Sequence, residues 1–136
     1  MTHGRSIEVA GIGHNAPIPL GARVGALLCS SGIAGKDPAT GKLSEDPARQ
    51  VAQAFANLDA FLAAGGATLA HLAKLTLYAS DPAQVRDAVN AEWLARFPDP
   101  QDRPARHLLT YALQHGMVVQ LEALAFIPPD NEPSRD

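Results

Sequence analysis

Cysteine, aromatic residues and clustered positive charge are all scarce in this chain of 136 residues. The single cysteine, Cys29, excludes an internal disulfide, and no Cys/His spacing typical of a zinc site accompanies it. We therefore expect neither a metal nor a cofactor. Eleven Lys and Arg residues stand as scattered singles against fourteen Asp and Glu residues, which gives a net charge of −3. This balance argues against nucleic acid as a main partner.

Long apolar runs are missing as well. No stretch reaches the roughly 20 residues that a membrane-spanning helix needs, and no charged-then-apolar leader is present. We expect a soluble, cytoplasmic protein without a membrane partner. The length suits one domain with a sizeable core. We divide the chain into an N-terminal arm (1–14), a folded domain (15–127) and a C-terminal tail (128–136).

Two segments carry clear helix signals. In 44–64, Asp46-Pro47 supplies a cap and a first-turn proline, apolar residues recur at helical spacing, and Gly65-Gly66 provides the C-cap. Ser80-Asp81-Pro82 begins a second helix by the same signals, and Pro98 ends it. The sequence therefore predicts two amphipathic helices that pack on a common core.

Strand patterns surround these helices. The apolar run 22–34 predicts a buried strand, in two pieces if it bends at its glycine, and 72–79 alternates as a strand does. Two further runs, 106–113 and 117–126, flank His115-Gly116, a pattern typical of a hairpin. The order predicts an α+β fold, a single-domain mixed β-sheet with both helices on one face.

Charge inside the last two apolar runs is the chemical signal. Arg106 follows the stiff Pro104-Ala105, whereas Gln120 and Glu122, two residues apart, project from the same face of a strand. A guanidinium and a carboxylate are costly to bury unpaired, so they pair, reach a water-filled cleft or meet a ligand. The residues alone leave an internal Arg106–Glu122 ion pair and a ligand site equally open.

Other candidates carry less information by themselves. Gly32 would let backbone N–H groups approach a ligand beside the Ser31 hydroxyl, although a plain strand end is the simpler interpretation. Asn90 lies off the apolar stripe of the second helix, a position that favours solvent, and His14 stands where the arm joins the domain. Polar residues among aliphatic ones in the strands favour a subunit interface containing clefts, which would cover the second face of the sheet.

Taken in order, several short pieces resemble the RidA/YjgF/L-PSP family of small trimeric proteins, many of which are enamine/imine deaminases. The resemblance covers roughly 15–127. Its pieces are Asn15-Ala16-Pro17, Ser31-Gly32, 37–41, Gln50 through Asn57, 74–78, Asn90 ahead of Trp93 and Phe97, 103–106, and 122–125.

The resemblance implies a homotrimer with a chorismate-mutase-like fold and ligand clefts between neighbouring subunits. It implies that Arg106 grips the carboxylate of a small metabolite through its two-pronged donor face. It also implies that Ser31, Gly32 and Asn90 surround the same cleft.

The chain departs from the family at the position that matters most for chemistry. Gln120 stands where the deaminating branch has a glutamate that positions the attacking water. An amide can hydrogen-bond a water but cannot take its proton, so Glu122 on the same face becomes a candidate substitute. The usual tyrosine-containing segment near the first strand and the cysteine after the arginine are missing as well, and His107 and Leu108 follow Arg106.

Three functions follow from these residues and the resemblance. The first is hydrolytic deamination of reactive enamines or imines to keto acids, with Arg106 anchoring the substrate and Gln120 or Glu122 holding water. The second is a non-catalytic, metabolite-sensing or regulatory trimer that binds a small carboxylate. The third, a ribonuclease or translation inhibitor as some relatives are named, is disfavoured by the acidic balance.

Overall fold

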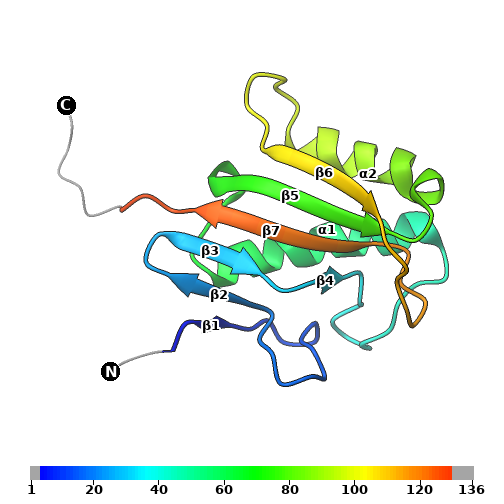
Figure 1. The fold of residues 1–136 in the computed structure, drawn as a ribbon, viewed down its shortest axis with the longest axis horizontal. Helices are drawn as coiled ribbons and strands as arrows, with labels where there is room; N and C mark the ends of the chain where they lie inside the picture. Colours follow the sequence, from blue (N-terminus) through cyan, green and yellow to red (C-terminus); the bar gives the residue numbers. More distant parts are fainter. Residues whose placement is uncertain (1–3, 130–136) are drawn as a thin grey trace.

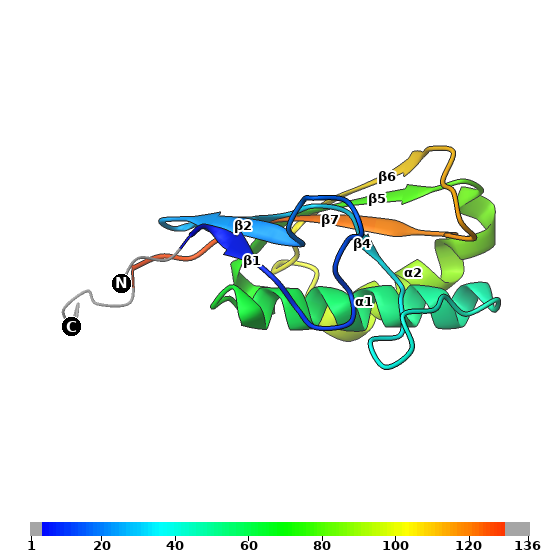
Figure 2. The same cartoon turned by 90° about the horizontal axis from the view of Figure 1, so that it is seen from below.

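The computed structural model describes residues 4–129, which form one seven-stranded sheet with two helices on one of its faces (Figure 1). The side view in Figure 2 shows both helices below the sheet, and no helix or strand of residues 4–129 lies above it. This confirms the predicted α+β mixed sheet with both helices on one face. Most of the predicted C-terminal tail, from 130 onward, lies outside the described residues.

In chain order, the helices and strands are β1 (Ser6–Ile7), β2 (Gly21–Val24), β3 (Leu27–Ser30), β4 (Ile33–Ala34), α1 (Pro47–Ala64), the 3-10 turn η1 (Leu69–His71), β5 (Leu72–Ala79), α2 (Pro82–Arg96), β6 (Ala105–Thr110) and β7 (Gln120–Phe126). The order across the sheet is β1-β2-β3-β7-β5-β6, and β4 pairs with β7 as well. No helix within 4–129 has the length and apolar character that a membrane crossing requires.

Local signals place the ends of α1. Asp46 accepts a hydrogen bond from the Ala48 amide (3.3 Å), Pro47 occupies the first turn, and Gly66 beyond the last turn has a φ of +82°. The apolar stripe of the helix is buried beneath the sheet. The second helix begins at Pro82 as predicted, although the Asp81 side chain makes no capping hydrogen bond.

The predicted hairpin between the last two strands is wrong. β5 lies between them, parallel to β6 and antiparallel to β7. The crossover through α2 places β6 parallel to β5 at the edge of the sheet, so the chain must pass over β5 to form β7. His115 (φ 62°) and Gly116 (φ 84°) do turn the chain, but within this longer connection. A hairpin does form earlier, between β2 and β3 at Gly25 (φ 59°), where the sequence predicted a bend.

Gln50 of α1 ties two loops to the helix. Its side chain is 1% exposed. Its Nε2 donates to the carbonyls of Ser44 (2.9 Å) and Gly116 (3.1 Å), and its Oε1 accepts from the Val118 amide (2.6 Å). The loop before α1 and the connection to β7 are therefore fixed by one buried amide.

Asn57 does the same for β4, two turns further along α1. Its Nδ2 donates to the carbonyls of Ala34 (2.9 Å) and Lys36 (2.8 Å), and its Oδ1 accepts from Gln53 (2.8 Å). The residue is 2% exposed, so these bonds form away from solvent. Together, Gln50 and Asn57 fix the positions of three segments relative to the sheet.

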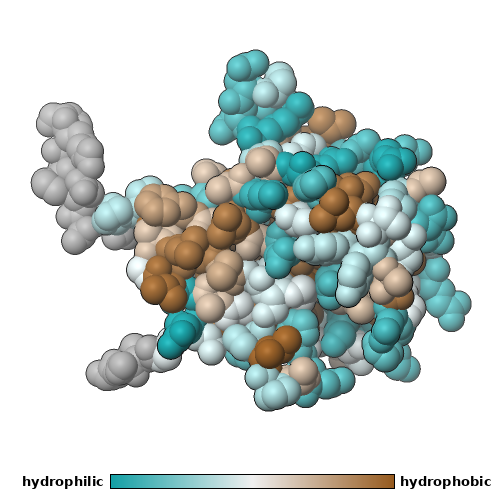
Figure 3. Space-filling model, in the orientation of Figure 1, coloured by the Kyte–Doolittle hydropathy of each residue, from teal (hydrophilic) through white to brown (hydrophobic). Residues whose placement is uncertain are grey.

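The helix-free face of the sheet carries an exposed apolar patch, formed by Val24, Leu27, Leu124 and Phe126. These side chains are between 41% and 61% exposed. Val24 pairs with Leu27, and Leu27 with Phe126, so the patch continues across three strands. Figure 3 shows it as the brown area toward the left of this face. Contiguous exposed apolar surface of this kind is typical of an interaction site.

Removal of the Gln50 amide should destabilise the whole domain. Gln50→Leu leaves one N–H and two carbonyl groups without their buried partner, and we expect a loss of about 3 kcal/mol in the free energy of unfolding. Urea unfolding followed by circular dichroism measures it. Gln84→Leu, at an exposed position of α2, is the matched control and should change stability by less than about 0.5 kcal/mol. Equal stabilities of the two variants would contradict this role of Gln50.

Candidate functional site

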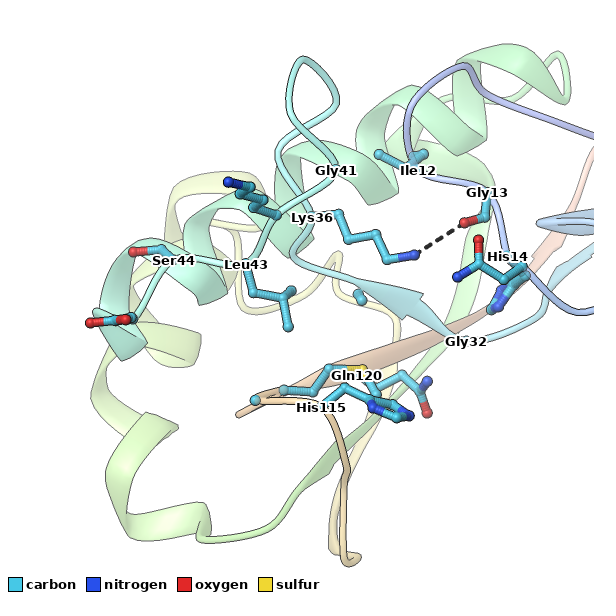
Figure 4. Close-up of a pocket in the computed structure, with 16 residues that line it drawn as sticks. Ile12, Gly13, His14, Gly32, Lys36, Gly41, Leu43, Ser44, His115 and Gln120 are labelled. Atoms are coloured by element: carbon cyan, nitrogen blue, oxygen red, sulfur yellow. Dashed lines mark hydrogen bonds between the residues drawn. The ribbon is translucent and has the colours of Figure 1, made fainter.

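A hollow of about 790 Å³ opens where the start of β7 and β4 meet the N-terminal segment (Figure 4). Its walls come from four parts of the chain, namely 12–15, 32–36, 41–45 and 115–120. Gln50 and Asn57 hold three of these four segments, as described above. The hollow is therefore built on α1 even though no residue of α1 lines it.

The hollow brings together two of the residues singled out from the sequence, Gln120 and Gly32. Gln120 opens β7 and is the register partner of Ala34. A Cβ atom at Gly32 would collide with the amide of Gln120. Glycine is therefore needed at this position for the amide to lie where it does.

Two polar groups near Gly13 also belong to the hollow. The Lys36 ammonium donates to the Gly13 carbonyl (3.2 Å), and within residues 4–129 it has no carboxylate partner within 4.0 Å. The His14 Nε2 atom is buried and has no hydrogen-bond partner among the described residues. The sequence pointed to His14 without a role, whereas Lys36 is an isolated lysine that no motif distinguishes.

Arg106 lies elsewhere, on the edge strand β6. Its register partner on β5, Leu75, is buried on the helix side of the sheet. The Arg106 guanidinium projects from this same side. Arg106 Nη2 donates to Asn90 Oδ1 (2.8 Å), and Arg106 Cζ lies 5.2 Å from the centroid of the Trp93 ring. The expectation that Asn90 faces solvent is wrong, because this residue orients the arginine.

The half-buried Arg106 guanidinium has no carboxylate partner within the described residues. Burial lowers its pKa from the ordinary value, and the nearby Arg86 adds to this, yet a guanidinium stays charged. By contrast, the equally interior Arg96 binds Asp59 and Glu92, each at 2.8 Å. Arg106 therefore keeps a charge and N–H donors that no other described residue uses.

The internal Arg106–Glu122 ion pair, which the sequence left open, does not form. Glu122 alternates with the buried Leu121 and Ala123, so it projects from the helix-free face, opposite to Arg106. There it accepts a hydrogen bond from the Tyr78 hydroxyl (3.1 Å). This bond, with burial and the negative charge of Glu122, raises the pKa of the Tyr78 phenol. Glu122 shares its face with Gln120, as predicted, but does not line the hollow.

Ser31 is half-buried and also lies outside the lining of the hollow. Its amide donates to the Leu20 carbonyl (2.7 Å). The neighbouring Ser30 is buried, and its hydroxyl accepts from the Ala123 amide (2.8 Å), which joins β3 to β7. The backbone of this segment thus serves the sheet, and Gly32 is the part that reaches the hollow.

The chain therefore presents two separate groups of candidate residues. Gln120 and Gly32 lie in the hollow, whereas Arg106 and Asn90 lie on the helix side of the edge strand β6, with β5 between β6 and β7. Within one chain the sheet keeps the two groups apart. Each group offers polar atoms that a ligand could use.

Solved structures define the class of this domain. The crystal structure of RidA from the Antarctic bacterium Psychrobacter sp. PAMC 21119 matches with a TM-score of 0.81 and 27% identity, over 90% of this chain and 99% of that one. The YjgF gene product of E. coli matches with a TM-score of 0.79 and 25% identity, over 90% and 98%. The two-helix, mixed-sheet domain is thus of the RidA/YjgF type.

Sequence comparison agrees with the fold. A relative in Aquifex aeolicus (strain VF5), described as a RutC family protein, is 35% identical over 96 residues, or 67% of this chain and 76% of the relative. The 2-iminobutanoate/2-iminopropanoate deaminase of Salmonella typhimurium (strain LT2) is 30% identical over 118 residues, or 82% and 91%. The profile of the family described as Endoribonuclease L-PSP matches residues 17–127. The chain belongs to the RidA/YjgF/L-PSP family, which confirms the resemblance seen in the sequence.

Proposed function

We propose that this protein forms a homotrimer whose intersubunit clefts bind small carboxylate-bearing molecules and hydrolyse reactive imines or enamines to keto acids. The observation that carries the proposal is the state of Arg106 on the edge strand of the sheet, a half-buried cation without a counter-charge among residues 4–129. A charge left uncompensated inside a fold is costly unless a ligand pairs with it. Its planar fork of donors suits a carboxylate.

A neighbouring subunit supplies the rest of the cleft in this proposal. Arg106 and the hollow with Gln120 are separated in one chain, but an edge strand can approach the hollow of the next subunit. The exposed apolar patch on the helix-free face gives such subunits a surface to bury. A head-to-tail contact of this kind closes into a ring when its rotation permits.

Arg106 then anchors the substrate carboxylate while the Gln120 side chain holds a water beside the imine carbon. The water adds to this carbon, its proton passes to nitrogen, and the resulting carbinolamine releases ammonia to leave the keto acid. Positioning is the main contribution of the protein, because Gln120 cannot take the proton of the water. The described activity of the Salmonella relative, a 2-iminobutanoate/2-iminopropanoate deaminase, supports this reaction class.

The alternative is a trimer that binds a carboxylate without turning it over, in a sensing or regulatory role. The observation that favours it is again Gln120, a neutral amide suited to ground-state hydrogen bonding. Both functions need Arg106, and they differ only in turnover.

Replacement of Arg106 should remove both activity and binding. An amino-acid oxidase generates 2-iminobutanoate in situ, and semicarbazide traps what has not been hydrolysed. We expect the wild type to lower the trapped fraction and Arg106→Ala to leave it at the level without protein, because the carboxylate loses its anchor. Arg49→Ala, at a side chain that is 83% exposed, is the matched control and should behave as wild type. A fully active Arg106→Ala protein would contradict the proposed site, and an inactive wild type that still binds keto acids through Arg106 would select the alternative.

Restoration of a carboxylate at position 120 should increase turnover. Gln120→Glu adds a group that can accept the proton of the attacking water, and general-base help is worth roughly 10²–10⁴ in rate. The same trapping assay measures the gain, and Gln114→Glu, on the exposed loop before β7, is the control for added negative charge. Unchanged turnover in Gln120→Glu would show that Gln120 does not face the reacting carbon.

A further inference from the structure

The hollow is larger and more positive than a small monocarboxylate requires. Its volume of about 790 Å³ would hold a ligand of drug size, whereas 2-iminobutanoate has only four carbon atoms. Its lining includes two lysines, Lys36 and Lys42, against one glutamate, Glu45. We propose that Lys36 and His14 recognise a second anionic group, so that the preferred ligands are dicarboxylic 2-imino acids and the corresponding 2-oxo acids. This inference rests on the proposed function.

Lys36 carries the charge part of the recognition. The backbone at this residue is fixed, because its carbonyl accepts from Asn57 and its pairing with Leu43 forms an isolated bridge. Lys36 is half-buried, and its ammonium donates to the Gly13 carbonyl (3.2 Å) and to no other group within residues 4–129. A second carboxylate on the ligand would supply the charge partner that the described fold does not provide.

No carboxylate among the described residues forms an ion pair with Lys36. Glu45 is exposed and forms no ion pair with either lysine of the hollow within residues 4–129. Glu8, whose side chain lies close to Gly13, accepts from the Leu20 amide through Oε1 (3.2 Å). Neither carboxylate lies within 4.0 Å of Lys36, so the ammonium is available to a ligand.

His14 adds a second, independent observation. Its Nε2 atom is buried and unpartnered among the described residues, a condition that costs free energy, and the ring must turn toward the hollow for a ligand atom to complete it. An imidazole N–H donates to a carboxylate oxygen. Figure 4 shows the end of the Lys36 side chain and His14 on the same side of the hollow, near Gly13, with Gln120 on the opposite side. A ligand whose imine carbon lies at Gln120 would extend its far carboxylate toward this side.

Calorimetric titration with two stable keto acids tests this arrangement. We expect 2-oxoglutarate to bind the wild type about tenfold more tightly than 2-oxobutanoate, since a charge-assisted hydrogen bond contributes at least that much. Lys36→Met should abolish this preference and leave the affinity for 2-oxobutanoate within about threefold. Lys36→Arg should restore most of the preference, and His14→Phe should reduce it. Arg49→Met, at an exposed side chain outside the lining of the hollow, is the matched control and should keep it.

The outcomes separate this inference from the proposed function. Equal affinities of the wild type for the two keto acids, or a preference that survives Lys36→Met, would overturn the role of Lys36 and leave the site on Arg106 intact. If neither keto acid binds the wild type, or if both bind Arg106→Ala unchanged, the proposed function fails and this inference fails with it.

Discussion

Two buried side-chain amides on α1 determine the geometry on which the candidate site depends. Gln50 joins the loop before the helix to the connection that leads into β7, and Asn57 holds β4 and the backbone of Lys36. Amides suit this task because each offers both donors and an acceptor to backbone groups that would otherwise be buried unpaired. The positions of the segments that line the hollow therefore depend on hydrogen bonds that Gln50 and Asn57 make inside the domain.

The sheet determines which residues can act together. β5 separates β6 from β7, and the alternation of side chains sends Arg106 toward α2 and Gln120 and Glu122 toward the helix-free face. Arg106 and Asn90 thus form one unit and Gln120 and Gly32 another. A site that needs both units must join two chains, and this links the proposed function to the proposed trimer.

Local signals in the sequence were sufficient for the helices and for the class of fold. Asp46-Pro47 and Gly65-Gly66 act on their immediate neighbours, so their effect can be predicted without the rest of the structure. The strand with which β6 and β7 each pair could not be predicted in this way. His115-Gly116 shows that the chain turns but does not show which strand lies alongside. Asn90 was predicted to face solvent because helical periodicity carries no information about an edge strand. Lys36 became a candidate only through its contacts with Gly13 and Asn57, which the sequence does not predict.

Mixing of two defective subunits tests the shared site most directly. Arg106→Ala removes the anchor, and Gly32→Val drives a side chain against Gln120, so we expect each variant alone to bind no 2-oxobutanoate. A refolded equimolar mixture should regain about a quarter of the wild-type binding capacity, because random assembly joins an intact Arg106 to an intact hollow at one interface in four. A mixture that binds no more than the separate variants would show that the site lies within one chain and would contradict the account.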